Sequence, residues 1–221
     1  HKTVHEKWNI NTGILAGDAM LIMAYQLFEN YDPQTFQSLS KIFSKTALEV
    51  CEGQQYDVDF ETRNDVSIPE YLKMIELKTA VLIGASAKSA AIIVGIDSDS
   101  YANYGRNLGL AFQIVDDILD ISADETTLGK PAFSDYKEGK TTLPYIFLYN
   151  ALNLDDKEIL KSLWGKELDE NQTKWIKGKF DEFNIVHKCK EFAKELGYKA
   201  IASVSDEGLK EIVSSMIDRE F

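Results

Sequence analysis

The stretch 112–120 (FQIVDDILD) carries three carboxylates in an otherwise apolar segment, and this combination restricts where the segment can lie. At about 100° per residue, Gln113, Asp116, Asp117 and Asp120 share one face of a helix, and apolar residues occupy the others. A helix that is apolar almost all round belongs inside a protein, where unpaired charge is costly. A divalent cation resolves this conflict, and oxygen ligands suit Mg²⁺. The alternative is an acidic helix edge that faces solvent.

Apolar residues in the rest of the chain recur at i, i+3, i+4 and i+7, which predicts an all-α fold. The chain has only 4 Pro and 13 Gly in 221 residues, and alternating runs are few. We predict helices over the ranges 8–28, 33–60, 68–94, 101–121, from about 144, and near 155–164, 169–183, 187–203 and 206–219. We expect a loop over 122–137 and, because no linker is evident, a single domain over 1–221.

Two helix starts have recognisable capping residues. Asp32 followed by Pro33 is an N-cap and N1 pair, and Ser67 followed by Glu70 is a capping box. The latter half of the helix that begins at Pro33 is polar, and we favour a cavity wall over a solvated face for its members: Glu52, Gln54, Gln55, Asp57 and Asp59.

Composition limits the classes of partner. The formal net charge of −12 argues against nucleic acid or an anionic membrane as a general partner, so an anionic substrate needs a local basic site or a metal. Cys51 and Cys189 are far apart in sequence, which indicates a reducing, cytoplasmic setting. No apolar run approaches the roughly 18–20 residues of a membrane span, so we expect no transmembrane segment.

Three lysines can complement the acidic stretch in a diphosphate site. Lys78, Lys130 and Lys140 come within reach if their helices pack together, and a lysine is a compact point charge suited to phosphate oxygens. Lys78 can also extend simply to solvent. The sequence has no G-x-x-x-x-G-K-[ST] motif and no convincing Ser-His-Asp or Cys-His set. Chemistry would therefore depend on metal, charge and cavity shape.

Four spaced elements together resemble the trans-isoprenyl diphosphate synthases, the head-to-tail polyprenyl synthetases. In order, these elements are Lys78-Thr79, the stretch 112–120, Gly129-Lys130 and Gly139-Lys140. The resemblance implies an all-α bundle around a central apolar cavity, assembled as a homodimer. It also implies head-to-tail condensation of isopentenyl diphosphate with an allylic diphosphate, with Mg²⁺ as the cofactor.

Carried over position by position, the resemblance implies metal binding by Asp116, Asp117 and Asp120, which match the second aspartate-rich motif. It implies catalytic and substrate-binding roles for Lys78, Thr79, Gln113 and Lys130, and a further contact to the allylic diphosphate by Lys140. In this interpretation the metal and the lysines stabilise the leaving diphosphate.

The chain begins where the first aspartate-rich motif of that family ends. We therefore expect the N-terminal helices and that motif to be absent from it, which makes the activity of this chain alone an open question. Two alternatives remain: a non-catalytic helical subunit of a prenyl synthase complex, and a terpene cyclase. The lysine-rich segment 130–140 argues against a cyclase.

Overall fold

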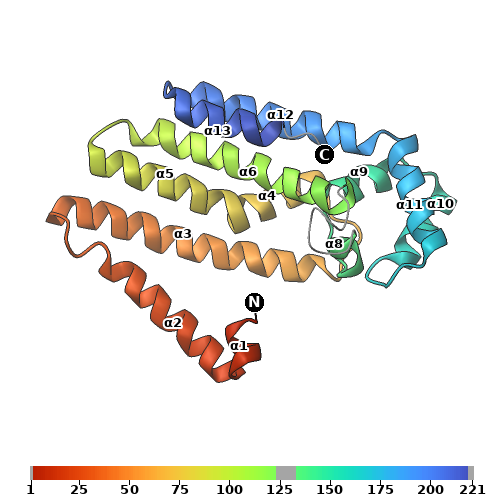
Figure 1. Cartoon of the computed structure of the whole chain (residues 1–221), viewed down its shortest axis with the longest axis horizontal. Helices are drawn as coiled ribbons and strands as arrows, with labels where there is room; N and C mark the ends of the chain where they lie inside the picture. The colour runs from red at the N-terminus through yellow and green to blue at the C-terminus, as the bar shows by residue number, and fades with distance from the viewer. Residues whose placement is uncertain (1, 123–132, 219–221) are drawn as a thin grey trace. The chain divides into compact units, whose positions relative to one another are not determined.

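The computed structural model describes residues 2–122 and 133–218, and the elements in these ranges are helices (Figure 1). The chain divides into two compact units, residues 1–45 and 46–221, which we describe separately. The all-α prediction is confirmed, whereas the single domain stays a prediction.

The first unit contains α1 (Val4–Lys7), α2 (Ile10–Gln26) and the beginning of α3 (Pro33–Phe60). The single helix predicted over 8–28 is wrong at its start, because the Asn9 side chain caps α2 by accepting a 2.8 Å hydrogen bond from the Thr12 amide. Asp32 caps α3 as predicted, with its carboxylate accepting from the amides of Gln34 (3.0 Å) and Thr35 (3.1 Å).

The second unit begins with the rest of α3, from residue 46, and a continuous helical run follows it. Its parts are α4 (Ile68–Ile75), a π-helical turn η1 (Glu76–Ala80) and α5 (Val81–Val94), and Gly95 ends it in the left-handed conformation, with φ at 74°. The predicted helix over 68–94 is confirmed in extent, but the sequence analysis did not predict the π turn.

The remaining helices follow in chain order. They are α6 (Ser98–Ser122), α8 (Ser134–Lys137), α9 (Leu143–Ala151), α10 (Leu154–Leu163), α11 (Glu170–Glu182), α12 (Ile185–Ser203) and α13 (Glu207–Ile217). The loop predicted over 122–137 is wrong at its C-terminal end, where α8 forms. Residues 123–132 lie outside the described residues.

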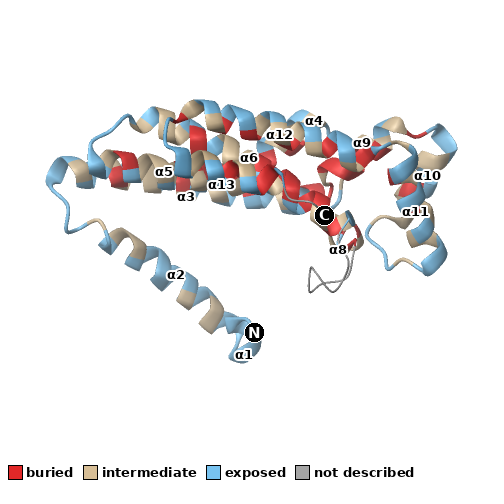
Figure 2. Cartoon of the chain, turned by 45° about the horizontal axis from the view of Figure 1, so that its top comes forward, coloured by how far each residue is buried: buried red, intermediate tan, exposed pale blue. Residues whose placement is uncertain are grey.

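Helix α6 is the central element of the second unit, with α5 packed along one side and α12 along another (Figure 1). Small residues let α5 and α6 approach closely: a Cβ added at Gly105 would lie 2.6 Å from the carbonyl oxygen of Ile83. Buried residues concentrate along these contacts (Figure 2). The larger apolar cluster includes five fully buried side chains (0% exposed): Ile114, Ile118, Leu143, Ile176 and Ile185. The packing of α6 therefore places its acidic stretch beside the core.

One described helical run is long and apolar enough to cross a membrane by length and composition. It is Ile68–Val94, with 27 residues; its most apolar 18-residue window has a mean hydropathy of 1.6 and is 28% buried. The expectation that no apolar run approaches the length of a span is therefore wrong for this stretch. A core helix passes the same test, and α5, the C-terminal part of this run, packs along α6.

Candidate diphosphate site

The π turn sets the directions of two predicted site residues, Lys78 and Thr79. In η1 the Val81 amide bonds to the Glu76 carbonyl, five residues back, so the turn holds one residue more than an α-helical turn. Turns of this kind are common at functional sites. Lys78 pairs with Asp57 at 2.6 Å, while the Thr79 hydroxyl donates to Gln113 Oε1 at 2.9 Å.

Asp117 lies in the protein interior and is surrounded by donors. Its side chain is buried, and it accepts hydrogen bonds from the Tyr71 hydroxyl (2.6 Å), Gln113 Nε2 (3.1 Å) and the Leu143 amide (3.4 Å). Desolvation by burial raises the pKa of Asp117 to about 7, although the bonds from Tyr71 and Gln113 oppose that shift. The carboxylate of Asp117 is therefore held in place by hydrogen bonds from other residues of the protein.

Asp120 anchors the chain that returns to α6 after the undescribed stretch. One of its oxygens accepts a 2.6 Å bond from the Ser134 hydroxyl, and the other accepts a 3.1 Å bond from the Asp135 amide. The Phe133 amide also bonds to the Asp120 carbonyl at 2.9 Å. Phe133 has φ at 62°, a left-handed conformation that is uncommon outside glycine, and its ring is buried. These contacts fix the start of α8, at Ser134.

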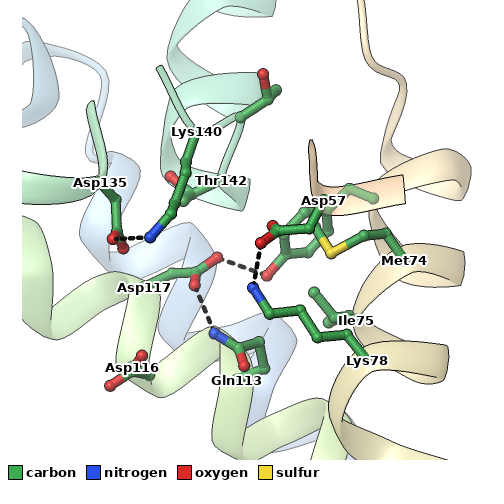
Figure 3. Close-up of a pocket in the computed structure, with 12 residues that line it drawn as sticks. Asp57, Met74, Ile75, Lys78, Gln113, Asp116, Asp117, Asp135, Lys140 and Thr142 are labelled. Carbon is green, nitrogen blue, oxygen red and sulfur yellow. Dashed lines mark hydrogen bonds and ion pairs between the residues drawn. The ribbon is translucent and has the colours of Figure 1, made fainter. Parts of the chain in front are cut away.

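The acidic stretch, the π turn and the segment after α8 meet at one pocket of about 180 Å³ (Figure 3). Five predicted site residues line it: Lys78, Gln113, Asp116, Asp117 and Lys140. Its other lining residues are Asp57, Tyr71, Met74, Ile75, Asp135, Thr141 and Thr142. The wall is mainly polar, so the expected apolar cavity stays a prediction. The pocket combines acids with two cationic side chains.

Both lysines of the pocket are paired with acids. Lys140 Nζ lies 2.7 Å from Glu138 and 3.3 Å from Asp135. Burial lowers the pKa of Lys140, but the Glu138 hydrogen bond and the charges of Asp135 and Glu138 outweigh burial and raise it. In Figure 3, Lys78 extends toward Asp57 and Lys140 toward Asp135. An anion that enters the pocket would therefore meet a protonated Lys140, whose positive charge is partly offset by the carboxylates of Asp135 and Glu138.

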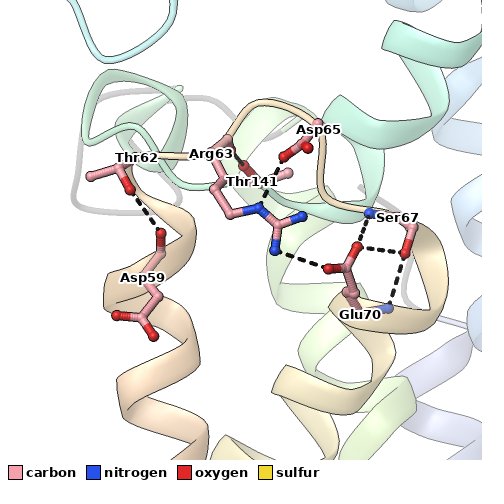
Figure 4. Close-up of polar contacts among 7 residues, drawn as sticks. All are labelled: Asp59, Thr62, Arg63, Asp65, Ser67, Glu70 and Thr141. Atoms are coloured by element: carbon pink, nitrogen blue, oxygen red, sulfur yellow. Dashed lines mark hydrogen bonds and ion pairs between the residues drawn. The ribbon is translucent and has the colours of Figure 1, made fainter.

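The backbone of the loop between α3 and α4 holds the segment that carries Lys140. The buried Thr141 hydroxyl donates to the Arg63 carbonyl at 3.0 Å (Figure 4). The Arg63 guanidinium reaches Asp65 and Glu70, each at 2.9 Å. Glu70 also accepts from Ser67 in the predicted capping box, and these hydrogen bonds lower the pKa of Glu70 to about 2. The start of α4 and the position of Lys140 are thus connected.

The structure separates the predicted site residues into three groups. Five of them line the pocket, as given above. Thr79 reaches the pocket only through Gln113, and Asp120 is not among the lining residues. Lys130 lies outside the described residues. The metal-binding, catalytic and substrate-binding roles of all these residues stay predictions.

Asp135 and Tyr71 also line the pocket, although neither was predicted from the sequence as a site residue. Asp57 belongs to the polar stretch for which we favoured a cavity wall, and it does line the pocket. Its neighbours Gln55 and Asp59 instead bond to each other, with Gln55 Nε2 donating at 2.8 Å. The acid five residues before Lys140 was a usable signal for Asp135, because Gly139 turns the chain back there with φ at 78°. Tyr71 has no such signal, since its spacing is that of a core residue.

The donor atoms of the pocket fit Mg²⁺, although they do not form a complete cage. Within the described residues no group of three or more His, Cys, Asp or Glu side chains is arranged to hold a metal ion. Asp116 is exposed, and its carboxylate makes no hydrogen bond to another described residue. Mg²⁺ is usually held by one or two carboxylates, waters and phosphate oxygens of the substrate. Asp116 suits that mode of binding, with acids and lysines around it.

The chain is similar to known proteins of one family. The family model for polyprenyl synthetases matches residues 1–178. The chain is 40% identical over 178 residues to geranylgeranyl diphosphate synthase of Sulfolobus acidocaldarius, covering 77% of this chain and 54% of that one. The chain thus spans about half the length of the curated relatives it matches: the matched region covers 54%, 50% and 52% of the length of three of them.

Solved structures give the same result. Geranylgeranyl pyrophosphate synthetase of Pyrococcus horikoshii has a TM-score of 0.90 at 32% identity, covering 98% of this chain and 70% of that one. Octaprenyl pyrophosphate synthase of Helicobacter pylori has a TM-score of 0.84 at 34% identity, covering 94% and 71%. This all-α chain belongs to the polyprenyl synthetase family, whose named relatives are prenyltransferases.

Proposed function

We propose that the protein catalyses head-to-tail condensation of isopentenyl diphosphate with an allylic diphosphate, and that it depends on Mg²⁺. The observation that carries this proposal is the single pocket in which Lys78, Gln113, Asp116 and Lys140 converge. Relatives named as farnesyl, geranylgeranyl and geranylfarnesyl diphosphate synthases support the reaction class. Their products differ in length, so the reaction class is proposed without a particular product.

The proposed chemistry uses charge rather than a protein nucleophile. Lys78 and Lys140 bind the allylic diphosphate and stabilise the negative charge that develops as its C–O bond breaks. Asp116 holds Mg²⁺, which neutralises the same leaving group when bound. The double bond of isopentenyl diphosphate then attacks the allylic cation, and the released diphosphate removes the proton that leaves. Gln113, with Thr79 behind it, lies beside the reacting carbon.

We also propose that the protein works as a homodimer. Helix α2 has large apolar side chains that are mostly exposed, including Ile10 (70%), Leu15 (67%), Met20 (69%) and Ile22 (63%). So many exposed large apolar side chains along one helix are unusual unless another surface covers them. A second copy of the chain is the occupant that the family resemblance favours.

The decisive experiment supplies the protein with Mg²⁺, isopentenyl diphosphate and allylic diphosphates of increasing length. Products are identified by mass spectrometry, and kcat/KM is measured for wild type, Lys78→Ala and Lys88→Ala. Lys88 is a matched control because it lies on α5, pairs with Asp99 at 2.6 Å and is not a pocket residue. We expect Lys78→Ala to lower kcat/KM by about 10²-fold, as for removal of a group that stabilises transition-state charge, and Lys88→Ala to have no effect.

Three results would contradict the proposal. Product formation only after a partner subunit is added would identify a non-catalytic helical subunit. Release of a cyclic hydrocarbon without isopentenyl diphosphate would identify a terpene cyclase. Equal loss of kcat/KM in the two lysine variants would mean that the pocket is not where the diphosphate binds.

A further inference from the structure

We propose that Tyr71 is a positioning residue for Gln113 and acts through the buried carboxylate of Asp117. The expected effect on catalysis rests on the proposed function, whereas the hydrogen-bond link from Tyr71 through Asp117 to Gln113 does not. Tyr71 lies on α4 and is only 1% exposed. No step of the proposed chemistry uses its hydroxyl, and yet it lines the same pocket as Gln113.

A continuous chain of hydrogen bonds joins Tyr71 to Thr79. The Tyr71 hydroxyl donates to Asp117 Oδ2 at 2.6 Å, and Gln113 Nε2 donates to Asp117 Oδ1 at 3.1 Å. The Thr79 hydroxyl donates to Gln113 Oε1 at 2.9 Å. The four residues come from α4, η1 and α6, so the chain connects three elements around the pocket.

This chain determines which end of the Gln113 amide faces which neighbour. Because the Asp117 carboxylate accepts from Gln113 Nε2 and the Thr79 hydroxyl donates to Gln113 Oε1, the amide nitrogen faces Asp117 and the amide oxygen faces Thr79. The reversed amide would place two oxygens against each other. With Asp117 fixed, the dipole of the Gln113 amide therefore has a single favourable direction inside the pocket.

Tyr71 is the donor that fixes Asp117. Among the described residues its 2.6 Å bond is the shortest that Asp117 accepts, and the one other donor to Oδ2, the Leu143 amide, lies at 3.4 Å. Asp117 is 3% exposed, so water is a poor replacement for a lost donor. Without the phenol, we expect the carboxylate to rotate toward other donors and the Gln113 amide to lose its fixed direction.

The test replaces one hydroxyl with hydrogen at two matched positions. Tyr71→Phe removes the proposed contact, and Tyr104→Phe is the control. Tyr104 is also buried, at 4% exposure, and its hydroxyl donates to the Leu209 carbonyl at 3.0 Å, but it does not line the pocket. Both variants therefore lose one internal tyrosine hydrogen bond, and thermal unfolding should report similar losses of stability.

The first readout needs no substrate. In ¹H–¹⁵N spectra of the whole chain, the Gln113 side-chain amide is assigned by its loss in Gln113→Leu. We expect hydrogen exchange of this amide to be at least about tenfold faster in Tyr71→Phe, since one bond is worth about a factor of ten, and unchanged in Tyr104→Phe. An unchanged amide in Tyr71→Phe, or the same change in Tyr104→Phe, would overturn the proposed link.

The second readout is the condensation reaction with Mg²⁺ and both substrates. We expect Tyr71→Phe to lower kcat about tenfold with KM within twofold of wild type, and Tyr104→Phe to match wild type. Unchanged kcat in Tyr71→Phe would overturn the positioning role. A wild-type protein that forms no product contradicts the proposed function instead, and the amide exchange still decides whether Tyr71 orients Gln113.

Discussion

The three aspartates of the acidic stretch 112–120 on α6 differ in their surroundings although they are nearly adjacent in sequence. Asp116 is exposed and faces the pocket, whereas Asp117 and Asp120 are buried and accept hydrogen bonds from protein donors. A buried carboxylate that already has good donors contributes to the folded structure, because removing it leaves those donors without a partner. Aspartates of one motif can therefore have different roles, one in the pocket and the others in stabilising the folded structure.

Substitution of Asp120 and of Asp116 should distinguish the structural role from the role in the pocket. We expect Asp120→Ala to lower the free energy of unfolding by about 1–3 kcal/mol, because Ser134 and the Asp135 amide lose their acceptor. Asp116→Ala should change it by less than about 0.5 kcal/mol, as is usual at exposed positions. Urea unfolding measures both values. The opposite order would contradict the assignment of Asp120 as an anchor.

Elements in the second unit are held by close approaches and by caps. At Gly53 in α3, an added Cβ would lie 2.2 Å from the Lys78 amide nitrogen, so α3 and η1 nearly touch through their backbones. Just beyond the C-terminus of α3, the segment around Arg63 leads to the capping box of α4 (Figure 4). Backbone contact and capping thus determine where Lys78 lies.

Gly53→Ala should be destabilising by about 3 kcal/mol or more, because the clash is with backbone that cannot move aside without shifting η1. Gly178→Ala is the control: Gly178 lies within α11, and an added Cβ there meets nothing within 4 Å. That change should stabilise the protein by about 0.5–1 kcal/mol, since alanine is the better helix former. Thermal unfolding of both variants tests the prediction. Similar effects at the two glycines would show that α3 and η1 are not in close contact.

The capping box of α4 should make stability depend on pH at the acidic end. The folded-state pKa of Glu70 is about 2, below the ordinary value of 4.5, so its stabilising contribution is complete above 4.5 and is lost as the pH falls toward 2. Glu70→Gln should therefore lose less stability than wild type between pH 5 and pH 2. Denaturant unfolding at several pH values measures this difference.

Glu211→Gln, at an exposed position on α13, is the control for that experiment and should follow wild type. Parallel curves for wild type and Glu70→Gln would contradict the role of the ionised Glu70 in the cap.

At the scale of elements, sequence alone predicted most of the fold. Asp32-Pro33 and Ser67–Glu70 predicted the starts of α3 and α4 because caps are local interactions between near neighbours. The π turn was not predictable, since it depends on how Lys78 and Thr79 meet partners on α3 and α6. The short helix α8 was missed because its start depends on Asp120, fourteen residues earlier.

The site was predictable only where residue type alone indicated chemistry. Lys78, Gln113, Asp116 and Lys140 could be named from their motifs and do line one pocket. Tyr71 could not be named, because its apolar spacing on α4 is that of a core residue and its hydroxyl matters only beside Asp117. Long-range polar partners are set by tertiary packing, which helical periodicity does not encode.

At the scale of the whole molecule, the exposed apolar side chains of α2 are the feature that most needs a partner. Burial of a leucine or isoleucine side chain is worth about 1.5–3 kcal/mol, so several of them together can stabilise a dimer. Leu15 and Ile22 are seven residues apart and lie on one face of α2, with 67% and 63% exposure. The same surface would favour aggregation if it were left uncovered.

The double variant Leu15→Glu/Ile22→Glu should weaken self-association at least about tenfold, since two apolar contacts would be replaced by charge. Sedimentation equilibrium measures the dimer dissociation constant, and circular dichroism checks that helix content is retained. The control is Leu154→Glu, which changes a single leucine of 80% exposure at the start of α10. An unaltered dimer in the double variant would mean that α2 is not the interface.

The π turn η1 also has a consequence for how such a chain can vary. Because η1 holds one residue more than an α-helical turn, the loss of one residue from 76 to 80 is absorbed when the turn closes to α-helical geometry, and α5 stays in register. Gly84 would then keep its place beside Ala102 and Arg106. The same deletion would redirect Lys78 or Thr79 away from Asp57 or Gln113. A shortened turn should therefore cost the pocket its contacts while the packing of α5 is retained.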